Sequence, residues 1–246
     1  MKARFITISI SHFCEKVRWV MDHYDYPYYE EAHAPLYHYL ATFPAGAGRT
    51  VPVLITQDEM LKDSTDILQY LSRTYQPAAN LYKSTEYCDS LELEEYFDQN
   101  LGSASRIISY YYNLKDPSVA IGSAVKNTPL FEALTLPLAI PLATPILNWL
   151  YEINEVSLKK SLSQVDNVFR RVENILSKSG SFLGGETPGA ADFTFAALAA
   201  PILLPEYYIP EISNLENVDP QFKSLVLKWR STSAGEFAFK MYKTRY

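Results

Sequence analysis

Ser11 and Cys14, near the start of the chain, are residue types suited to chemistry on sulfur. They follow a β-branched and aromatic run from Phe5 to Ile10, which predicts a buried or half-buried strand. From Ser11 onward apolar residues recur at three- and four-residue steps, which predicts an amphipathic helix with Ser11 as its N-cap. A helix start offers free N–H groups and a positive dipole end. We therefore expect an anion site at Ser11, with a hydroxyl able to stabilise a thiolate.

Cys14 lies one turn into this predicted helix, on the face that it shares with Val17 and Met21. That face favours a buried, inert thiol, because a small sulfur side chain packs well in a core. The alternative is an exposed thiol near the helix start. Its pKa would then be lowered, and it would exchange with disulfides.

Two further features follow in the first third of the chain. Pro52 stands near the start of a predicted strand that ends at Ile55, where a proline is normally confined to an edge or a special position. After a short hairpin, Asp63 and Ser64 open a second amphipathic helix. Such a pair is a routine cap. It could also bind an amino acid, with Ser64 on the carboxylate and Asp63 on the ammonium group.

The rest of the chain, from Leu91, has a helical pattern of long apolar stripes that we interpret as core packing. In a loop near residue 189, Gly189 is the predicted N-cap of a helix that is apolar nearly all round. Asp192, at the third helical position, should accept a hydrogen bond from the N-cap N–H. Glycine lacks the side-chain oxygen of a full cap, which Thr187 could supply. Both Gly189 and Asp192 are therefore predicted to be structural.

An uncharged apolar segment, Ala133 to Tyr151, is long enough to cross a membrane. Against a span stand Pro137, Pro141 and Pro145, each of which removes a helix hydrogen bond, and the lack of basic flanks. We expect no membrane span, and interpret the segment as buried or pocket-lining.

Composition describes an ordinary soluble chain of 246 residues, with 48% hydrophobic content and a formal net charge of −6. The negative charge and the lack of basic runs argue against a nucleic-acid partner. Two cysteines far apart make no disulfide framework and fit a reducing compartment. The N-terminus does not read as a signal peptide, so a cytoplasmic location is expected. The four scattered histidines predict no metal site.

The strand, Ser-x-x-Cys and helix of the N-terminus resemble the opening of the thioredoxin-like half of a glutathione transferase. The stretch Cys14 to Trp19 is similar to the corresponding region of the serine- and cysteine-type classes (theta, zeta, omega). The Val-Pro strand, the Asp-Ser helix start and the Ala-Ala-Asp loop resemble later family motifs, in the family order. The resemblance implies an α/β thioredoxin-like domain over residues 1–82, a linker over 83–90 and an all-α helical domain over 91–246.

The resemblance also implies a role for each candidate residue in binding glutathione. Pro52 would be a cis-proline, and Val51 before it would offer its backbone to the cysteinyl part. Asp63 and Ser64 would hold the γ-glutamyl end. The glycine carboxylate would fall to His38 or Arg49, neither of which lies in a recognisable motif.

Ser11 aligns with the catalytic residue of these classes, which implies an enzyme of detoxification that joins the glutathione thiolate to a small hydrophobic electrophile. Glutathione would be the co-substrate, and a homodimer is the implied assembly. One alternative is a thiol transferase, or disulfide reductase, that uses Cys14. Another is a glutathione-transferase-like binding protein without catalysis.

Overall fold

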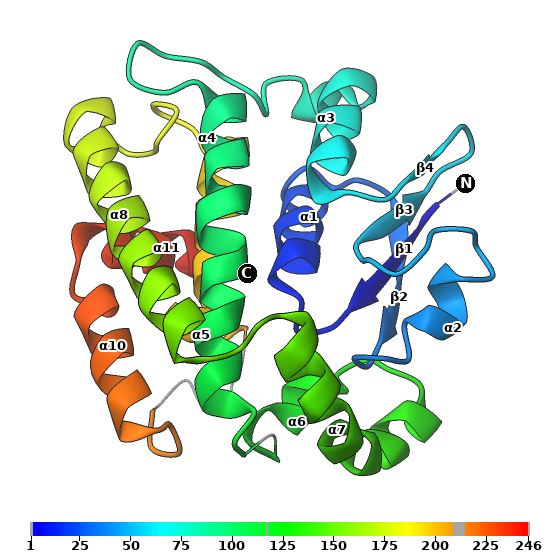
Figure 1. Cartoon of the computed structure of the whole chain (residues 1–246). Helices are drawn as coiled ribbons and strands as arrows, with labels where there is room; N and C mark the ends of the chain where they lie inside the picture. Colours follow the sequence, from blue (N-terminus) through cyan, green and yellow to red (C-terminus); the bar gives the residue numbers. More distant parts are fainter. Residues whose placement is uncertain (1, 117, 209–214, 246) are drawn as a thin grey trace.

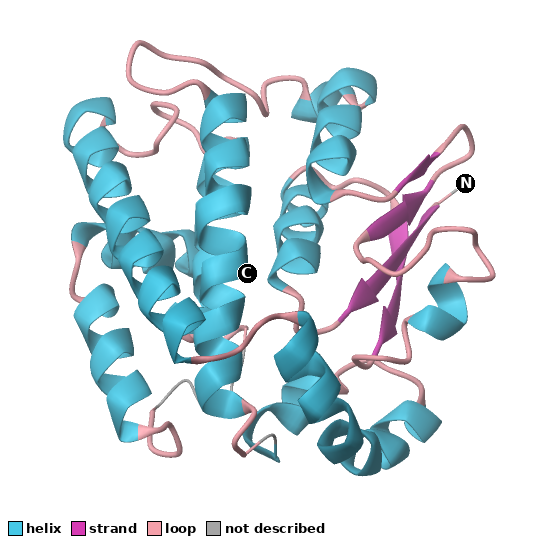
Figure 2. Ribbon diagram, in the orientation of Figure 1, coloured by secondary structure: helices cyan, strands magenta, loops and turns pink. Residues whose placement is uncertain are grey.

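The computed structural model describes residues 2–116, 118–208 and 215–245. Its first part is a four-stranded sheet in the order β2-β1-β3-β4, drawn in magenta in Figure 2. The strands are β1 (Ala3–Ile8), β2 (Tyr28–His33), β3 (Val53–Ile55) and β4 (Met60–Leu61). β1 runs parallel to β2 and antiparallel to β3. This mixed sheet, with a helix between its two parallel strands, is the predicted thioredoxin-like arrangement.

Helices cover both faces of the sheet (Figure 1). The side chains of successive residues in β1 lie on opposite faces of the sheet, as in any strand. Phe5 packs into the core formed with α1 (His12–His23) and α3 (Ser64–Thr74). Ile6 packs on the opposite face, in a small cluster beside α2 (Tyr39–Thr42).

The second part of the chain is helical, as predicted. After the short turn η1 (Gln76–Ala78), α4 (Ser90–Phe97), the π-turn η2 (Asp98–Gly102) and α5 (Ser103–Asn113) follow one another directly. The remaining helices are α6 (Ser118–Ala124), α7 (Leu130–Leu150), α8 (Glu155–Ser179), α9 (Ala190–Leu203), α10 (Pro220–Arg230) and α11 (Ser233–Lys243).

α9 is the buried centre of this part, and all 14 of its residues are buried. It packs against α4, α5 and α11, and also against α1 of the first part. At that last contact the rings of Trp19 and Phe193 meet edge to face, with centroids 5.9 Å apart. The two parts of the chain therefore share one apolar core.

The start of α9 confirms the structural prediction for Asp192. Its carboxylate accepts from the N–H of Gly189 at 2.9 Å and from the N–H of Leu183 at 2.7 Å. Thr187 does not complete the cap, since its hydroxyl accepts from Lys83 instead. A Cβ on Gly189 would lie 2.9 Å from the Leu81 carbonyl oxygen, so glycine stands here because the backbone comes close.

The apolar segment belongs to α7, which is a continuous helix through Pro137, Pro141 and Pro145. The prolines are four residues apart and exposed, so they share one side of the helix, where water can reach the carbonyl groups that they leave unpaired.

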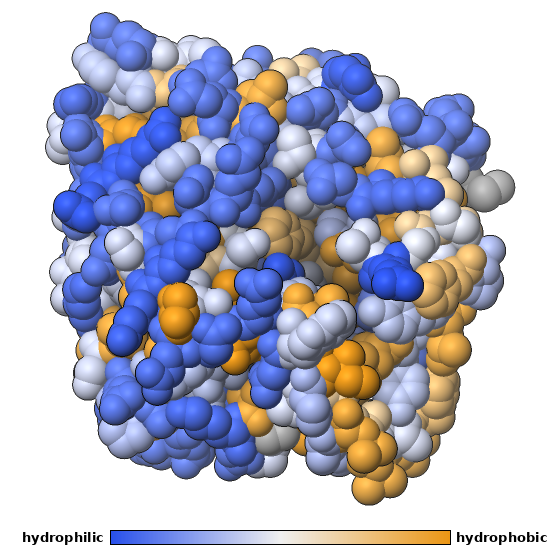
Figure 3. Space-filling model, viewed as in Figure 1, coloured by the Kyte–Doolittle hydropathy of each residue, from blue (hydrophilic) through white to orange (hydrophobic). Residues whose placement is uncertain are grey.

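The interpretation of this segment as buried was wrong, because α7 is mostly exposed and only Glu132, Leu136 and Ala143 are buried along it. Figure 3 shows apolar groups gathered over α7 at the lower right. By length and composition alone, α7 is the one helix in the described ranges that could cross a membrane.

Candidate functional site

Ser11 is the N-cap of α1, as predicted. Its side-chain oxygen accepts from the N–H of Cys14 at 3.3 Å. Because the oxygen is already an acceptor, the hydroxyl proton remains free to donate. Among the described residues, the N–H groups of His12 and Phe13 have no hydrogen-bond partner. The helix start therefore offers one hydroxyl and two amide donors to an anion.

The second part of the chain fixes this helix start through Gly102. The Nε2 atom of His12 donates to the Gly102 carbonyl oxygen at 2.9 Å. A Cβ on Gly102 would lie only 2.5 Å from the Cζ atom of Phe13, so the ring of Phe13 lies directly on the glycine. Burial, together with Arg106, lowers the pKa of His12 to about 3. His12 is therefore neutral beside Ser11.

Cys14 is completely buried and forms no disulfide. This confirms the interpretation of a packed thiol. Burial raises the pKa of the Cys14 thiol to about 11, although the hydrogen bond with Ser11 and the charge of Arg18 act in the opposite direction. At neutral pH the sulfur is protonated, and it is out of reach of a disulfide in solution.

The Val51–Pro52 peptide bond is cis, as expected. Pro52 is buried, and Val51 is partly exposed just before β3. The strand begins at Val53, later than the sequence indicated, because the two residues before it belong to the cis turn.

Asp63 and Ser64 begin α3, also as predicted. The carboxylate of Asp63 accepts from the N–H groups of Thr65 and Asp66, so Asp63 is the N-cap. Ser64 is buried as the first helical residue. No hydrogen bond of the Ser64 hydroxyl is found within the described ranges, which leaves it available to a ligand.

The two candidates for the glycine carboxylate contact each other. The Nε2 atom of His38 lies 3.1 Å from the carbonyl oxygen of Arg49. His38 is buried, and burial lowers its pKa, so the ring is a neutral support for the loop. The Arg49 side chain is exposed.

A buried ionic cluster behind the helix starts was missed by the sequence analysis. The Nζ atom of Lys16 lies 2.5 Å from Glu94 and 2.8 Å from Asp98, and both Lys16 and Glu94 are 0% exposed. The hydroxyl of Thr65, next to Ser64, lies 3.0 Å from Glu94 and 2.9 Å from Asp98 and can donate to either, and Tyr82 donates to Glu94. Burial raises the pKa of Asp98, against the attraction of Lys16. The cluster joins α1 and α3 to the second part of the chain.

Ser11, Pro52 and Ser64 line neither of the two described cavities. The larger cavity lies between α2 and α7, and the smaller lies between α1 and the residues that follow α6 and α9. The space-filling view does show a recess between the sheet side and the helical side of the molecule (Figure 3). Across the described ranges, no group of three or more His, Cys, Asp or Glu residues could hold a metal ion.

Comparison with known proteins gives a consistent result. Residues 5–79 match the family model described as glutathione S-transferase, N-terminal domain. Among curated proteins, none matches the chain.

Solved structures match over nearly the whole chain. Poplar glutathione transferase F1 has a TM-score of 0.56 at 14% sequence identity, covering 99% of both chains. The Tau class enzyme of mango, Mangifera indica, has a TM-score of 0.54 at 14% identity, covering 100% of this chain and 99% of that one. A protein from Methylobacterium radiotolerans, in complex with glutathione sulfonate, has a TM-score of 0.54 at 11% identity, covering 97% and 95%. These likenesses confirm the predicted fold class.

Proposed function

Because residues 5–79 place the chain in the glutathione transferase family, we propose that it joins the glutathione thiolate to hydrophobic electrophiles. The observation that carries this proposal is the start of α1. There the Ser11 hydroxyl keeps a free proton at a helix N-terminus, while the nearby Cys14 is buried.

In the proposed complex, glutathione lies across three chain segments. Val51, before the cis-proline Pro52, offers its backbone to the cysteinyl part. The free hydroxyl and the backbone N–H of Ser64 take the γ-glutamyl carboxylate, while Asp63 faces the ammonium group. Arg49 takes the glycine carboxylate, because its guanidinium is exposed.

The proposed chemistry needs only a modest electrostatic contribution. A thiol ionises near pH 8.5, and lowering its pKa by about two units amounts to about 2.7 kcal/mol of preference for the thiolate. One hydroxyl and two amide donors at the positive end of α1 are suited to supply it. The protein stabilises the anion without bonding to it, so the sulfur stays free to attack.

Thiol transfer by Cys14 is less well supported. That reaction requires the Cys14 thiolate to attack a disulfide, but the sulfur is buried and its pKa is raised to about 11. A glutathione-binding protein without catalysis is the second candidate. Ser11 lines neither described cavity, so neither of them would hold an electrophile against it.

Two substitutions separate these functions. Ser11→Ala should lower conjugation to an activated aryl halide by about ten- to a thousand-fold, the range for losing one oriented donor. Cys14→Ala should change the rate little. If wild type instead reduces mixed disulfides strongly and Cys14→Ala abolishes that activity, the protein is a thiol transferase. Binding of glutathione with no turnover of any electrophile would support the second candidate.

The γ-glutamyl contact has its own test. Ser64→Ala should weaken glutathione binding in calorimetry by about 1–3 kcal/mol, because a charged group loses a partner. Ser72→Ala, two turns further along α3, is the matched control and should bind like wild type. Equal affinity for the Ser64 variant would remove this residue from the site.

We propose a cytoplasmic homodimer with a role in detoxification as the working form of this enzyme. Light scattering at micromolar concentration tests the assembly, and a monomeric mass would contradict it.

A further inference from the structure

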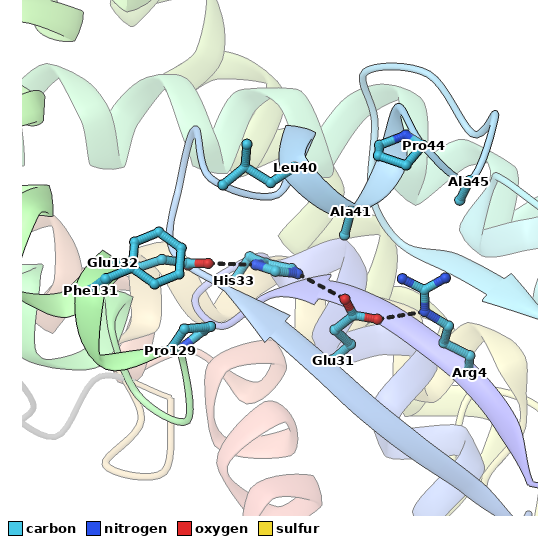
Figure 4. Close-up of a pocket in the computed structure, with 10 residues that line it drawn as sticks. All are labelled: Arg4, Glu31, His33, Leu40, Ala41, Pro44, Ala45, Pro129, Phe131 and Glu132. Atoms are coloured by element: carbon cyan, nitrogen blue, oxygen red, sulfur yellow. Dashed lines mark hydrogen bonds and ion pairs between the residues drawn. The ribbon is translucent and has the colours of Figure 1, made fainter.

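The larger of the two described cavities, about 370 Å³, is not lined by Ser11. Figure 4 shows it between the sheet, α2 and the first turn of α7. Arg4 of β1 and Glu31 and His33 of β2 form its floor, on the face of the sheet opposite α1. A cavity of this size is in the range that holds a small molecule.

The walls of the cavity are apolar. They come from the α2 segment and from the start of α7: Leu40, Ala41, Pro44, Ala45, Pro129 and Phe131. Leu40 and Phe131 are each more than half exposed, so these walls are accessible to a ligand. The walls therefore suit a hydrocarbon part.

The polar groups of the floor form a row in which every carboxylate oxygen has a nitrogen neighbour. Glu132 faces His33 Nδ1 at 2.7 Å and the N–H of Ala34 at 2.7 Å. Glu31 faces His33 Nε2 at 3.3 Å and accepts from Nε of Arg4 at 2.5 Å. Each carboxylate oxygen of the floor thus already has one nitrogen of the protein beside it.

Arg4 is different, because only its Nε atom is used. Its two terminal nitrogens have no partner among the described residues, and Figure 4 shows them pointing away from Glu31, toward Ala41 and Ala45. Arg4 therefore has spare hydrogen-bond donors on a cationic group that faces the cavity. A guanidinium with two free nitrogens matches the two oxygens of a carboxylate.

We propose that this cavity binds an amphipathic anion, a carboxylate on an unbranched apolar chain. The carboxylate lies on the terminal nitrogens of Arg4, and the chain lies along Leu40 and Phe131. Phe131 also begins the exposed apolar side of α7, which continues through Leu134 and Leu138. A chain longer than the cavity therefore has an apolar surface to follow.

Calorimetric titration of the full-length protein with decanoate tests the proposal. Decanoate should bind, and decanol and decylamine should bind at least tenfold more weakly. Octanoate should bind more weakly than decanoate by about three- to fourfold for each methylene removed. Equal binding of decanoate and decylamine would overturn the proposal.

Variants locate the site. Arg4→Gln should weaken decanoate binding at least tenfold, and Arg4→Lys should restore part of the loss. Phe131→Ala should weaken binding without changing the preference for decanoate over decylamine. Arg73→Gln, an exposed arginine on α3, is the matched control and should bind like wild type.

Decanoate binding that survives Arg4→Gln unchanged would place the chain on the bare surface of α7 and refute the site. Circular dichroism confirms that each variant is folded. Glutathione affinity should be the same in Arg4→Gln as in wild type. The result of the decanoate experiment is therefore independent of the function proposed for Ser11.

Discussion

α7 and α9 are both apolar helices with almost no charge, and they occupy opposite environments. α9 is buried along its whole length, with helices of both parts of the chain around it. α7 presents a row of large apolar side chains to the surface, with Leu138 74% and Leu142 79% exposed. Apolar composition alone therefore did not determine burial. The two helices differ in the segments that lead into them. The start of α9 is hydrogen-bonded to the carbonyl of Leu81, whereas α7 lies in the segment that connects α5 to α8.

The contrast extends to charge. The buried contact between the two parts of the chain contains Lys16, Glu94 and Asp98, while the exposed side of α7 carries no charged residue. Charges are tolerated inside because they are paired. An apolar surface of this extent normally marks a contact with another molecule.

The largest expected effect is in the buried helix. Phe195→Ala in α9 should lower the free energy of unfolding by about 3–5 kcal/mol, because the ring is fully buried and a cavity remains. Leu138→Ala in α7 is the matched variant, and it should change stability by less than about 0.5 kcal/mol. Urea unfolding of both variants measures the difference. Equal losses would mean that α7 is covered in solution.

A comparable effect is expected from the buried charges. Lys16→Met should destabilise the fold by about 3–5 kcal/mol, because Glu94 and Asp98 lose their cation while one of them has no exposure at all. Lys160→Met, on the exposed side of α8, serves as the control. An unfolding midpoint equal to that of the control would show that the cluster is not a stabilising pair.

A smaller effect concerns pH. The pKa of His12 is depressed in the folded state to about 3, so the folded state disfavours the charged ring. Its contribution to stability is complete above about pH 6.5 and is lost as the pH falls below that value. At pH 5 the loss is about 2 kcal/mol.

His12→Gln isolates this contribution, because the amide can still donate to the Gly102 carbonyl but does not titrate. Between pH 7.5 and pH 5, wild type should lose more stability than the variant, as measured by urea unfolding. Parallel pH profiles for the two proteins would contradict the assignment.

The smallest effect on stability is expected on the exposed side of α7. Leu138→Ser should leave stability within about 0.5 kcal/mol of wild type. It should reduce the fluorescence of a dye that binds apolar surfaces, because it interrupts the exposed side of α7. Unchanged dye fluorescence would show that the dye binds another part of the molecule.

The sequence predicted those features whose signals are local. The cap at Ser11 and the Asp192 bond to Gly189 each follow from a motif of a few residues. The cis-proline at Pro52 followed from the family resemblance of the Val-Pro strand. It could not predict the contact of His12 with Gly102, because the partners are 90 residues apart and glycine leaves no apolar pattern.

The ionic cluster around Lys16 could not be predicted from the sequence for a related reason. A lysine on an amphipathic helix is normally solvated, and its carboxylate partners belong to a different part of the chain. The cavity floor was also unpredicted, since Glu132 reaches the chain beside His33 only through the folding of α7 across the sheet edge.

The loop before Ser11 has a consequence for synthesis. The hydroxyl of Tyr208 donates to the carbonyl of Ile10, 198 residues earlier, and the hydroxyl of Ser9 donates to the carbonyl of Lys126. The strands of the sheet all emerge from the ribosome within the first 61 residues and can pair early. Ser9 and Ile10, which lead into Ser11, have both of these partners only when residue 208 has been made. On the ribosome the nascent chain can therefore form its sheet long before the thiolate site proposed at Ser11 is complete.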